Sequence, residues 1–109
     1  FSKETCQAIE LELCLAAINK GGFNILGHAG AMTIRQFGEF PLDYFEIIIE
    51  ACAKHDIAFE INYKCHYKIY SKLKKILQRH NPPVTFGSDA HNIDEIVNWS
   101  LDFGGECYA

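Results

Sequence analysis

The sequence lacks several features that would place it in whole classes of protein. It has no apolar run approaching the roughly 18 residues that a membrane-spanning helix needs, and no signal-peptide pattern at its start. With 3 Pro and 8 Gly among 109 residues, it is neither collagen-like nor of low complexity. We therefore expect a single cytoplasmic domain without a membrane partner.

Positive charge is also scarce. The chain carries 10 Lys and Arg against 14 Asp and Glu, which gives a net charge of −4 at pH 7. Proteins that bind through phosphate-backbone contacts normally carry the opposite balance, so a nucleic-acid partner is not expected. The densest basic stretch, residues 64–79, also has apolar residues at helical spacing. We interpret its lysines as the solvated face of an amphipathic helix rather than as a binding patch.

Several cysteine and nucleotide motifs are missing as well. The 5 cysteines include no Cys-x-x-Cys pair, which excludes a zinc ribbon and a thioredoxin-like site. Cys6, Cys14 and Cys52 lie among apolar residues, where free cysteine behaves as a small hydrophobe, and this favours a reducing compartment. Neither a dinucleotide-binding glycine loop nor a Walker-type Gly-Lys-Ser/Thr is present, so no nucleotide cofactor is expected.

What the sequence does contain is a regular succession of short apolar segments. Helices are predicted over residues 3–19 (with Ser2 as N-cap), from residue 41, over 67–79 and over 92–101, and strands over 23–26, 57–61 and 84–86. Each of the first two helices is expected to bury one apolar stripe. These stripes are Cys6, Ile9, Leu13, Ala16 and Ala17 in the first helix and Leu42, Phe45, Ile48, Ile49 and Cys52 in the second.

This order, a helix followed by three βα units, predicts the fold class. Strands of three to five apolar residues without polar alternation are typical of a parallel sheet that is covered on both faces. Alternating strands and helices then indicate an α/β fold, which is either an open wound sheet or an arc of a barrel.

Polar residues gather where the predicted strands end. His28 follows the first strand, Glu60 and Asn62 belong to the second, and Asp89 and His91 follow the third. Functional residues of parallel α/β folds collect at the carboxyl ends of the strands, so we expect these side chains at one rim. Imidazole and carboxylate groups together predict a metal site for zinc, manganese or iron.

Each of these residues also has a structural interpretation. Asp89 could cap the following helix and leave His91 exposed, and His28 could be a turn histidine bonded to backbone. A carboxylate inside an apolar strand must find a cation, a metal ion or several hydrogen bonds, so Glu60 could be a ligand or the partner of one. His66 is not expected to be a ligand together with Cys65, since adjacent residues on a helix diverge.

The segments Ile25-Leu26-Gly27-His28, Phe59-Glu60-Ile61-Asn62 and Phe86-Gly87-Ser88-Asp89-Ala90-His91 resemble the PHP (polymerase and histidinol phosphatase) family in order and spacing. The resemblance covers nearly the whole chain and is to the C-terminal portion of that domain. It implies a distorted (β/α)7 barrel with a multinuclear metal site at the carboxyl rim, with up to three divalent ions.

The same resemblance implies roles for individual residues. His28 would be a ligand of one metal ion, and Asp89 and His91 would bind two others. Glu60 and Asn62 match a recurring sequence of the family, either as ligands or as partners of ligands. The implied activity is that of a metal-dependent phosphoesterase acting on phosphate monoesters of small molecules. The alternatives are a nuclease or proofreading domain of a DNA polymerase, and a non-catalytic fragment.

The chain departs from the family's pattern in its first part. The family's earlier motifs, an N-terminal His-x-His among them, have no counterpart before His28, and no histidine precedes Gly27. Residues 1–109 are therefore expected to be the C-terminal portion of a PHP domain, with the N-terminal part of the domain as the partner that completes the site. Alone, the chain is expected to be inactive, because an incomplete ligand set leaves the metal geometry unfixed.

Overall fold

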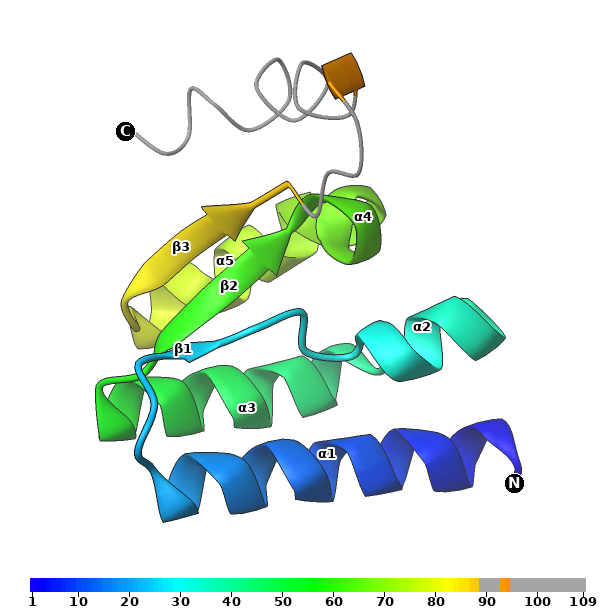
Figure 1. Ribbon diagram of the computed structural model, residues 1–109, viewed down its shortest axis with the longest axis horizontal. Helices are drawn as coiled ribbons and strands as arrows, with labels where there is room; N and C mark the ends of the chain where they lie inside the picture. The colour runs from blue at the N-terminus through cyan, green and yellow to red at the C-terminus, as the bar shows by residue number, and fades with distance from the viewer. Residues whose placement is uncertain (89–92, 95–109) are drawn as a thin grey trace.

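The computed structural model describes residues 1–88 and 93–94 and shows a small α/β unit (Figure 1). The predicted last helix therefore lies almost entirely outside the described residues. The elements in chain order are α1 (Lys3–Lys20), β1 (Ile25–Leu26), α2 (Ala31–Phe37), α3 (Leu42–His55), β2 (Ala58–Asn62), α4 (Tyr63–His66), the 3-10 helix η1 (Tyr67–Ile69), α5 (Tyr70–His80) and β3 (Val84–Gly87).

The three strands form one parallel sheet in the order β1-β2-β3, which confirms the predicted α/β class. Phe59 of β2 pairs with Leu26 of β1 and with Val84 of β3, so the carboxyl ends of the strands lie at one edge of the sheet. The central strand β2 is buried along most of its length. The part of the chain that the structure describes has no further strand, so it does not include the barrel that the resemblance implies.

One hydrophobic core joins the helices to the sheet. Phe59 and Ile61 of β2 are two residues apart, so they lie on the same face of the sheet, and both are almost fully buried in this core. The predicted stripe of α3 is largely confirmed, with Leu42 as the exposed exception. The main core side chains from the helices are Ile18, Phe45, Ile48, Ile49, Cys52, Leu73, Ile76 and Leu77.

Helix α1 begins as predicted and presents a different face from the predicted one. The Ser2 hydroxyl accepts a hydrogen bond from the Thr5 amide and caps the helix. Ile9 and Leu13, which were expected to be buried, are 42% and 58% exposed. The residues that α1 buries are Gln7, Glu10, Leu11 and Ile18. The prediction was wrong because it assigned the polar residues of the helix to solvent.

The buried carboxylate of Glu10 has a specific structural role. It accepts hydrogen bonds from the Thr33 hydroxyl (2.6 Å), the Thr33 amide (2.9 Å) and the Met32 amide (3.3 Å). These amides belong to the first turn of α2, whose own N-cap, Gly30, supplies no side chain. Glu10 therefore caps α2 from a neighbouring helix and satisfies amides that the short helix leaves without partners.

Two of the cysteines pack as small hydrophobes. Burial raises the pKa of the Cys14 thiol to about 11 and that of Cys52 to about 12, so both thiols stay protonated at neutral pH. The described cysteines, Cys6, Cys14, Cys52 and Cys65, are free. Within residues 1–88 and 93–94, no helix combines the length and the apolar character that crossing a membrane requires.

Candidate functional site

The predicted site residues that the structure describes meet at the carboxyl ends of β1 and β2. His28 lies two residues beyond β1, and Glu60 and Asn62 are in the last half of β2. Hydrogen bonds join all three residues. The other two predicted ligands, Asp89 and His91, lie outside the described residues.

Glu60 is the centre of this group. Its Oε1 atom accepts a hydrogen bond from the His28 amide at 2.9 Å and one from the Asn62 side-chain nitrogen at 3.3 Å. The side chain lies between Gly27 on one side and Gly87 on the other, and the missing β-carbon of Gly87 leaves room for the carboxylate. Among the described residues, no hydrogen bond reaches the second oxygen, Oε2. A half-buried carboxylate is thus held in place through one oxygen while the other remains available to a ligand.

Asn62 fixes this arrangement from the end of β2. Its side-chain oxygen accepts hydrogen bonds from the amides of Lys64 (3.1 Å) and Cys65 (3.3 Å) and so caps α4. Its side-chain nitrogen donates to Glu60. Because its oxygen is already used as the cap, Asn62 acts here by positioning Glu60 and the turn into α4.

His28 has an unusual backbone conformation. Its φ of 34° lies in the left-handed region, which a residue with a β-carbon adopts at a cost of order 1–3 kcal/mol. The hydrogen bond from its amide to Glu60 helps to hold this conformation. The imidazole is exposed at the rim, so it can bind a ligand from solvent.

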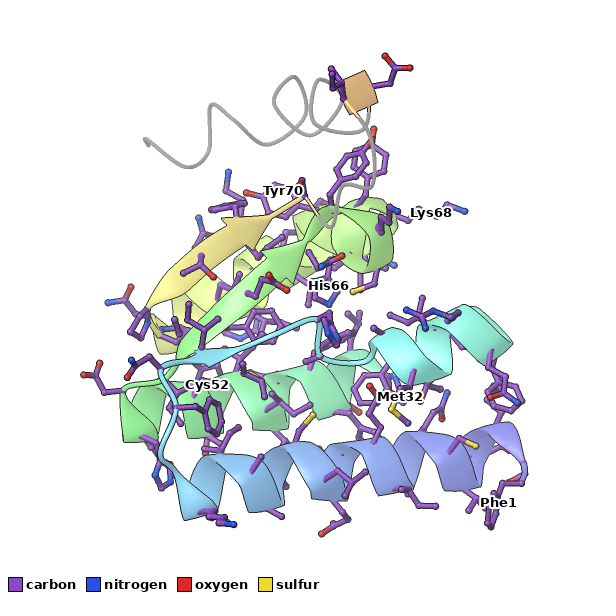
Figure 2. The ribbon with its side chains drawn as sticks, viewed as in Figure 1. Phe1, Met32, Cys52, His66, Lys68 and Tyr70 are labelled. Carbon is purple, nitrogen blue, oxygen red and sulfur yellow. The ribbon has the colours of Figure 1, made fainter. Side chains whose placement is uncertain are left out.

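The buried His66, which the sequence did not indicate as a ligand, stabilises the rim through hydrogen bonds. His66 is fully buried, and its Nδ1 accepts a hydrogen bond from the Asn62 amide at 2.9 Å. His66 is labelled in Figure 2, and its Nε2 lies 2.8 Å from the Ala29 carbonyl oxygen. A carbonyl can only accept and an amide can only donate, so the ring is neutral with its proton on Nε2.

The environment of His66 keeps the ring neutral. Its ring stacks on Phe59 and meets Phe45 edge-on. Burial lowers the pKa of His66 below its usual value, because the charged ring would lose its hydration. His66 thereby ties the loop after β1 to the end of β2. No local sequence signal distinguishes such a residue from the exposed histidines.

A cavity of about 260 Å³ opens at this rim. His28 and Asn62 line it together with two cationic side chains, Arg35 from the last turn of α2 and Lys64 from α4. The other lining residues are Ala31, Ile34 and Cys65. An imidazole and two cations around a small cavity are suited to a phosphate group, which ionised donors bind more strongly than neutral ones.

The donor set fits a divalent metal in part. His28 and Glu60 supply a nitrogen and an oxygen of the type that zinc, manganese and iron accept. Within the described residues, however, no three His, Cys, Asp or Glu side chains are grouped closely enough to hold an ion. A complete site would need further ligands, and the predicted ones within this chain are Asp89 and His91.

Comparison with protein-family models, with curated proteins and with solved structures finds no match to this chain. The family resemblance therefore rests on the three sequence motifs alone.

Proposed function

We propose that the chain supplies the C-terminal portion of a PHP-type (β/α)7 barrel in a metal-dependent phosphoesterase, which hydrolyses phosphate monoesters of small molecules as histidinol phosphatases do. The observation that carries the proposal is the hydrogen bonding of the Glu60 carboxylate. The carboxylate is held by His28 and Asn62 through Oε1, and Oε2 has no hydrogen-bond partner within the described residues. A half-buried carboxylate oxygen without a partner is costly unless a cation or a metal ion binds it.

In this proposal, the rim residues divide into metal ligands and phosphate-binding groups. His28 and Glu60 hold a divalent ion, zinc, manganese or iron, together with Asp89 and His91. Such an ion, when bound, neutralises negative charge on the phosphate and favours attack by water near neutral pH. Arg35 and Lys64 line the adjoining cavity, where they bind the phosphate oxygens and orient the ester.

The supporting residues keep this geometry fixed before the substrate arrives. Asn62 holds the carboxylate of Glu60 and caps α4, the element that carries Lys64. His66 joins the loop after β1 to the end of β2 through its two ring nitrogens. A site on strand ends that is braced by hydrogen bonds positions its ligands more accurately than a site on free loops.

The test is phosphatase activity of the full-length protein with added Mn²⁺ or Zn²⁺ and a chromogenic phosphate monoester. We expect His28→Ala and the double substitution Asp89→Ala with His91→Ala each to lower kcat/KM by about 100-fold or more, since outer partners alone cost 10- to 100-fold. The matched control is His55→Ala, which removes an exposed imidazole at the end of α3 and leaves activity unchanged. Activity that survives the double substitution, or that needs no metal, contradicts the proposal.

A further inference from the structure

A second, larger groove adjoins the cavity at the rim. Its volume is about 710 Å³, and it shares Ile34, Lys64 and Cys65 with the smaller cavity. It lies between α1, the segment that joins α2 to α3, and the turns from α4 to α5. Its lining is completed by Lys3, Glu4, Gln7, Gly38, Glu39, Phe40, Pro41, Leu42, Lys68, Ile69 and Lys72.

The groove lies on the most basic part of an acidic chain. Residues 61–88 contain 6 Lys and Arg and no Asp or Glu, whereas the rest of the chain has 4 basic and 14 acidic residues. Lys64, Lys68 and Lys72 line one wall of the groove (the lysine wall), and Figure 2 shows the Lys68 side chain extending away from the helices. Lys68 and Lys72 form no ion pair with any described residue.

The lysine wall is a row of charges. Its three lysines follow one another at four-residue intervals, with Lys64 on α4, Lys68 on η1 and Lys72 on α5, and all three line the groove. One isolated anion would require cations that converge on a point, whereas a row matches a ligand with several negative charges in line. The opposite wall carries Glu4 and the Lys3–Glu39 ion pair. Between the walls, the half-buried Ile34 and Ile69 supply apolar surface.

These features discriminate between two extended anionic ligands. Single-stranded nucleic acid binds by stacking its bases on exposed aromatic side chains. The one aromatic residue among the described lining residues is Phe40, and it is only 5% exposed. An acidic amphipathic helix instead presents carboxylates at four-residue spacing beside an apolar stripe. That pattern matches both the lysine wall and the apolar surface.

We propose that this groove binds an acidic amphipathic helix of a partner protein, with its carboxylates against Lys64, Lys68 and Lys72 and its apolar residues against Ile34 and Ile69. From the sequence, these lysines were interpreted as a solvated helix face. In the present proposal, they instead bind the carboxylates of the partner helix. The groove shares Lys64 with the phosphate-binding cavity, but peptide binding requires no metal ion and can therefore be tested apart from the phosphoesterase function.

The test uses a designed peptide as the probe. A fluorescent peptide of about 20 residues, roughly 30 Å long as a helix, carries Glu at positions i, i+4 and i+8 beside a leucine stripe. Its binding to the full-length protein is followed by fluorescence anisotropy in EDTA, which separates the result from any metal-dependent function. We expect saturable binding that weakens as salt rises, and a peptide of the same composition in scrambled order to bind at least about tenfold more weakly.

Charge-reversal variants locate the binding site. Lys68→Glu with Lys72→Glu should weaken binding by about tenfold or more, and a peptide with Lys in place of its three Glu should restore it. The matched control is Lys75→Glu, because Lys75 is an exposed residue of α5 outside the groove. Cys65 provides a second readout: it lines the groove, so the bound peptide should slow its alkylation.

Three results would overturn the proposal. The first is no saturable binding of the designed peptide. The second is equal peptide affinity in the variant with Lys68→Glu and Lys72→Glu and in the control Lys75→Glu. The third is an oligothymidine that binds more tightly than the peptide and loses its binding with the same two reversals, since the groove would then be a nucleic-acid site.

Discussion

The carboxyl group of Glu60 occupies the space beside Gly87 in which any other residue would place its side chain. A β-carbon at position 87 would lie 3.0 Å from Cδ of Glu60 and would also overlap Oε2. On the other side, a β-carbon at position 27 would lie 3.8 Å from Oε1, which is an ordinary contact. The two neighbouring glycines therefore have different roles, and only Gly87 is required for the carboxylate to lie where it does.

This difference gives a first prediction. Gly87→Ala should destabilise the protein by about 1–3 kcal/mol, as overpacking does, since the new methyl group displaces the Glu60 carboxylate from its hydrogen bonds. Gly27→Ala is the matched control and should change stability by less than about 0.5 kcal/mol. Urea unfolding followed by circular dichroism measures both effects.

A double-substitution cycle identifies the cause of the Gly87 effect. If the clash with Glu60 is responsible, Gly87→Ala should cost little in a protein that already carries Glu60→Ala. Equal destabilisation in the two backgrounds would show that the methyl group acts on something other than this carboxylate.

The second prediction concerns His66 and pH. Its pKa is lowered in the folded protein, so between the usual value of 6.5 and the folded value the unfolded chain binds the proton more readily. The stability that the neutral ring contributes is therefore fully present above about pH 6.5 and is lost progressively as the pH falls below it.

NMR of the imidazole nitrogens tests this directly. The ring of His66 should show the neutral tautomer with its proton on Nε2 at pH 7 and should titrate below 6.5, while urea unfolding should show stability falling over the same range. His55→Gln serves as the control. It removes an exposed imidazole, and the loss of stability at low pH should remain in this variant. A proton on Nδ1, or a titration at or above 6.5, would refute the assignment.

A third prediction concerns the buried carboxylate of α1. Glu10→Ala removes the acceptor for the Met32 and Thr33 amides and leaves buried donors unpaired, so it should cost about 2–3 kcal/mol. Glu12→Ala, which removes an exposed carboxylate of the same helix, should change stability by less than about 0.5 kcal/mol. Hydrogen exchange at Met32 and Thr33 should accelerate only in the Glu10 variant, and unchanged protection there would contradict the capping role.

Much of the fold could be predicted because its signals are local. The apolar runs around Phe59 and Phe86 gave two of the strands, and the spacing of Phe45, Ile48 and Ile49 gave the buried stripe of α3. The parallel arrangement followed from the alternation of strands and helices. These patterns depend on residues close in the chain, so periodicity is sufficient to find them.

The two failures in the first part of the chain have one physical origin. Helix α2 was missed, and the buried face of α1 was assigned incorrectly, because long-range hydrogen bonds to Glu10 join the two helices. Glu10 caps α2 from a distance of 23 residues along the chain, and it is buried for that reason. Neither helix shows this locally: a glutamate on a helix is ordinarily solvated, and a short helix between Gly30 and Gly38 has no cap of its own.

The location of the candidate site could be predicted more readily than the hydrogen bonds between its residues. The strand-end rule located His28, Glu60 and Asn62, and the structure brings these three together. The strand-end rule could not show that the side-chain oxygen of Asn62 caps α4. It also could not show that His66 forms hydrogen bonds at the rim through both ring nitrogens. Those roles depend on partners up to 37 residues away, such as Ala29 for His66.

Metal analysis of the full-length protein tests the central claim, that the carboxyl ends of β1 and β2 help to hold a divalent ion. After incubation with excess Zn²⁺ or Mn²⁺ and removal of free metal, we expect at least about one ion per chain in the wild type and in His55→Ala. His28→Ala and Glu60→Gln should each retain less, with unchanged circular dichroism. Less than one ion per chain in the wild type, or equal metal content in all four proteins, would contradict the account.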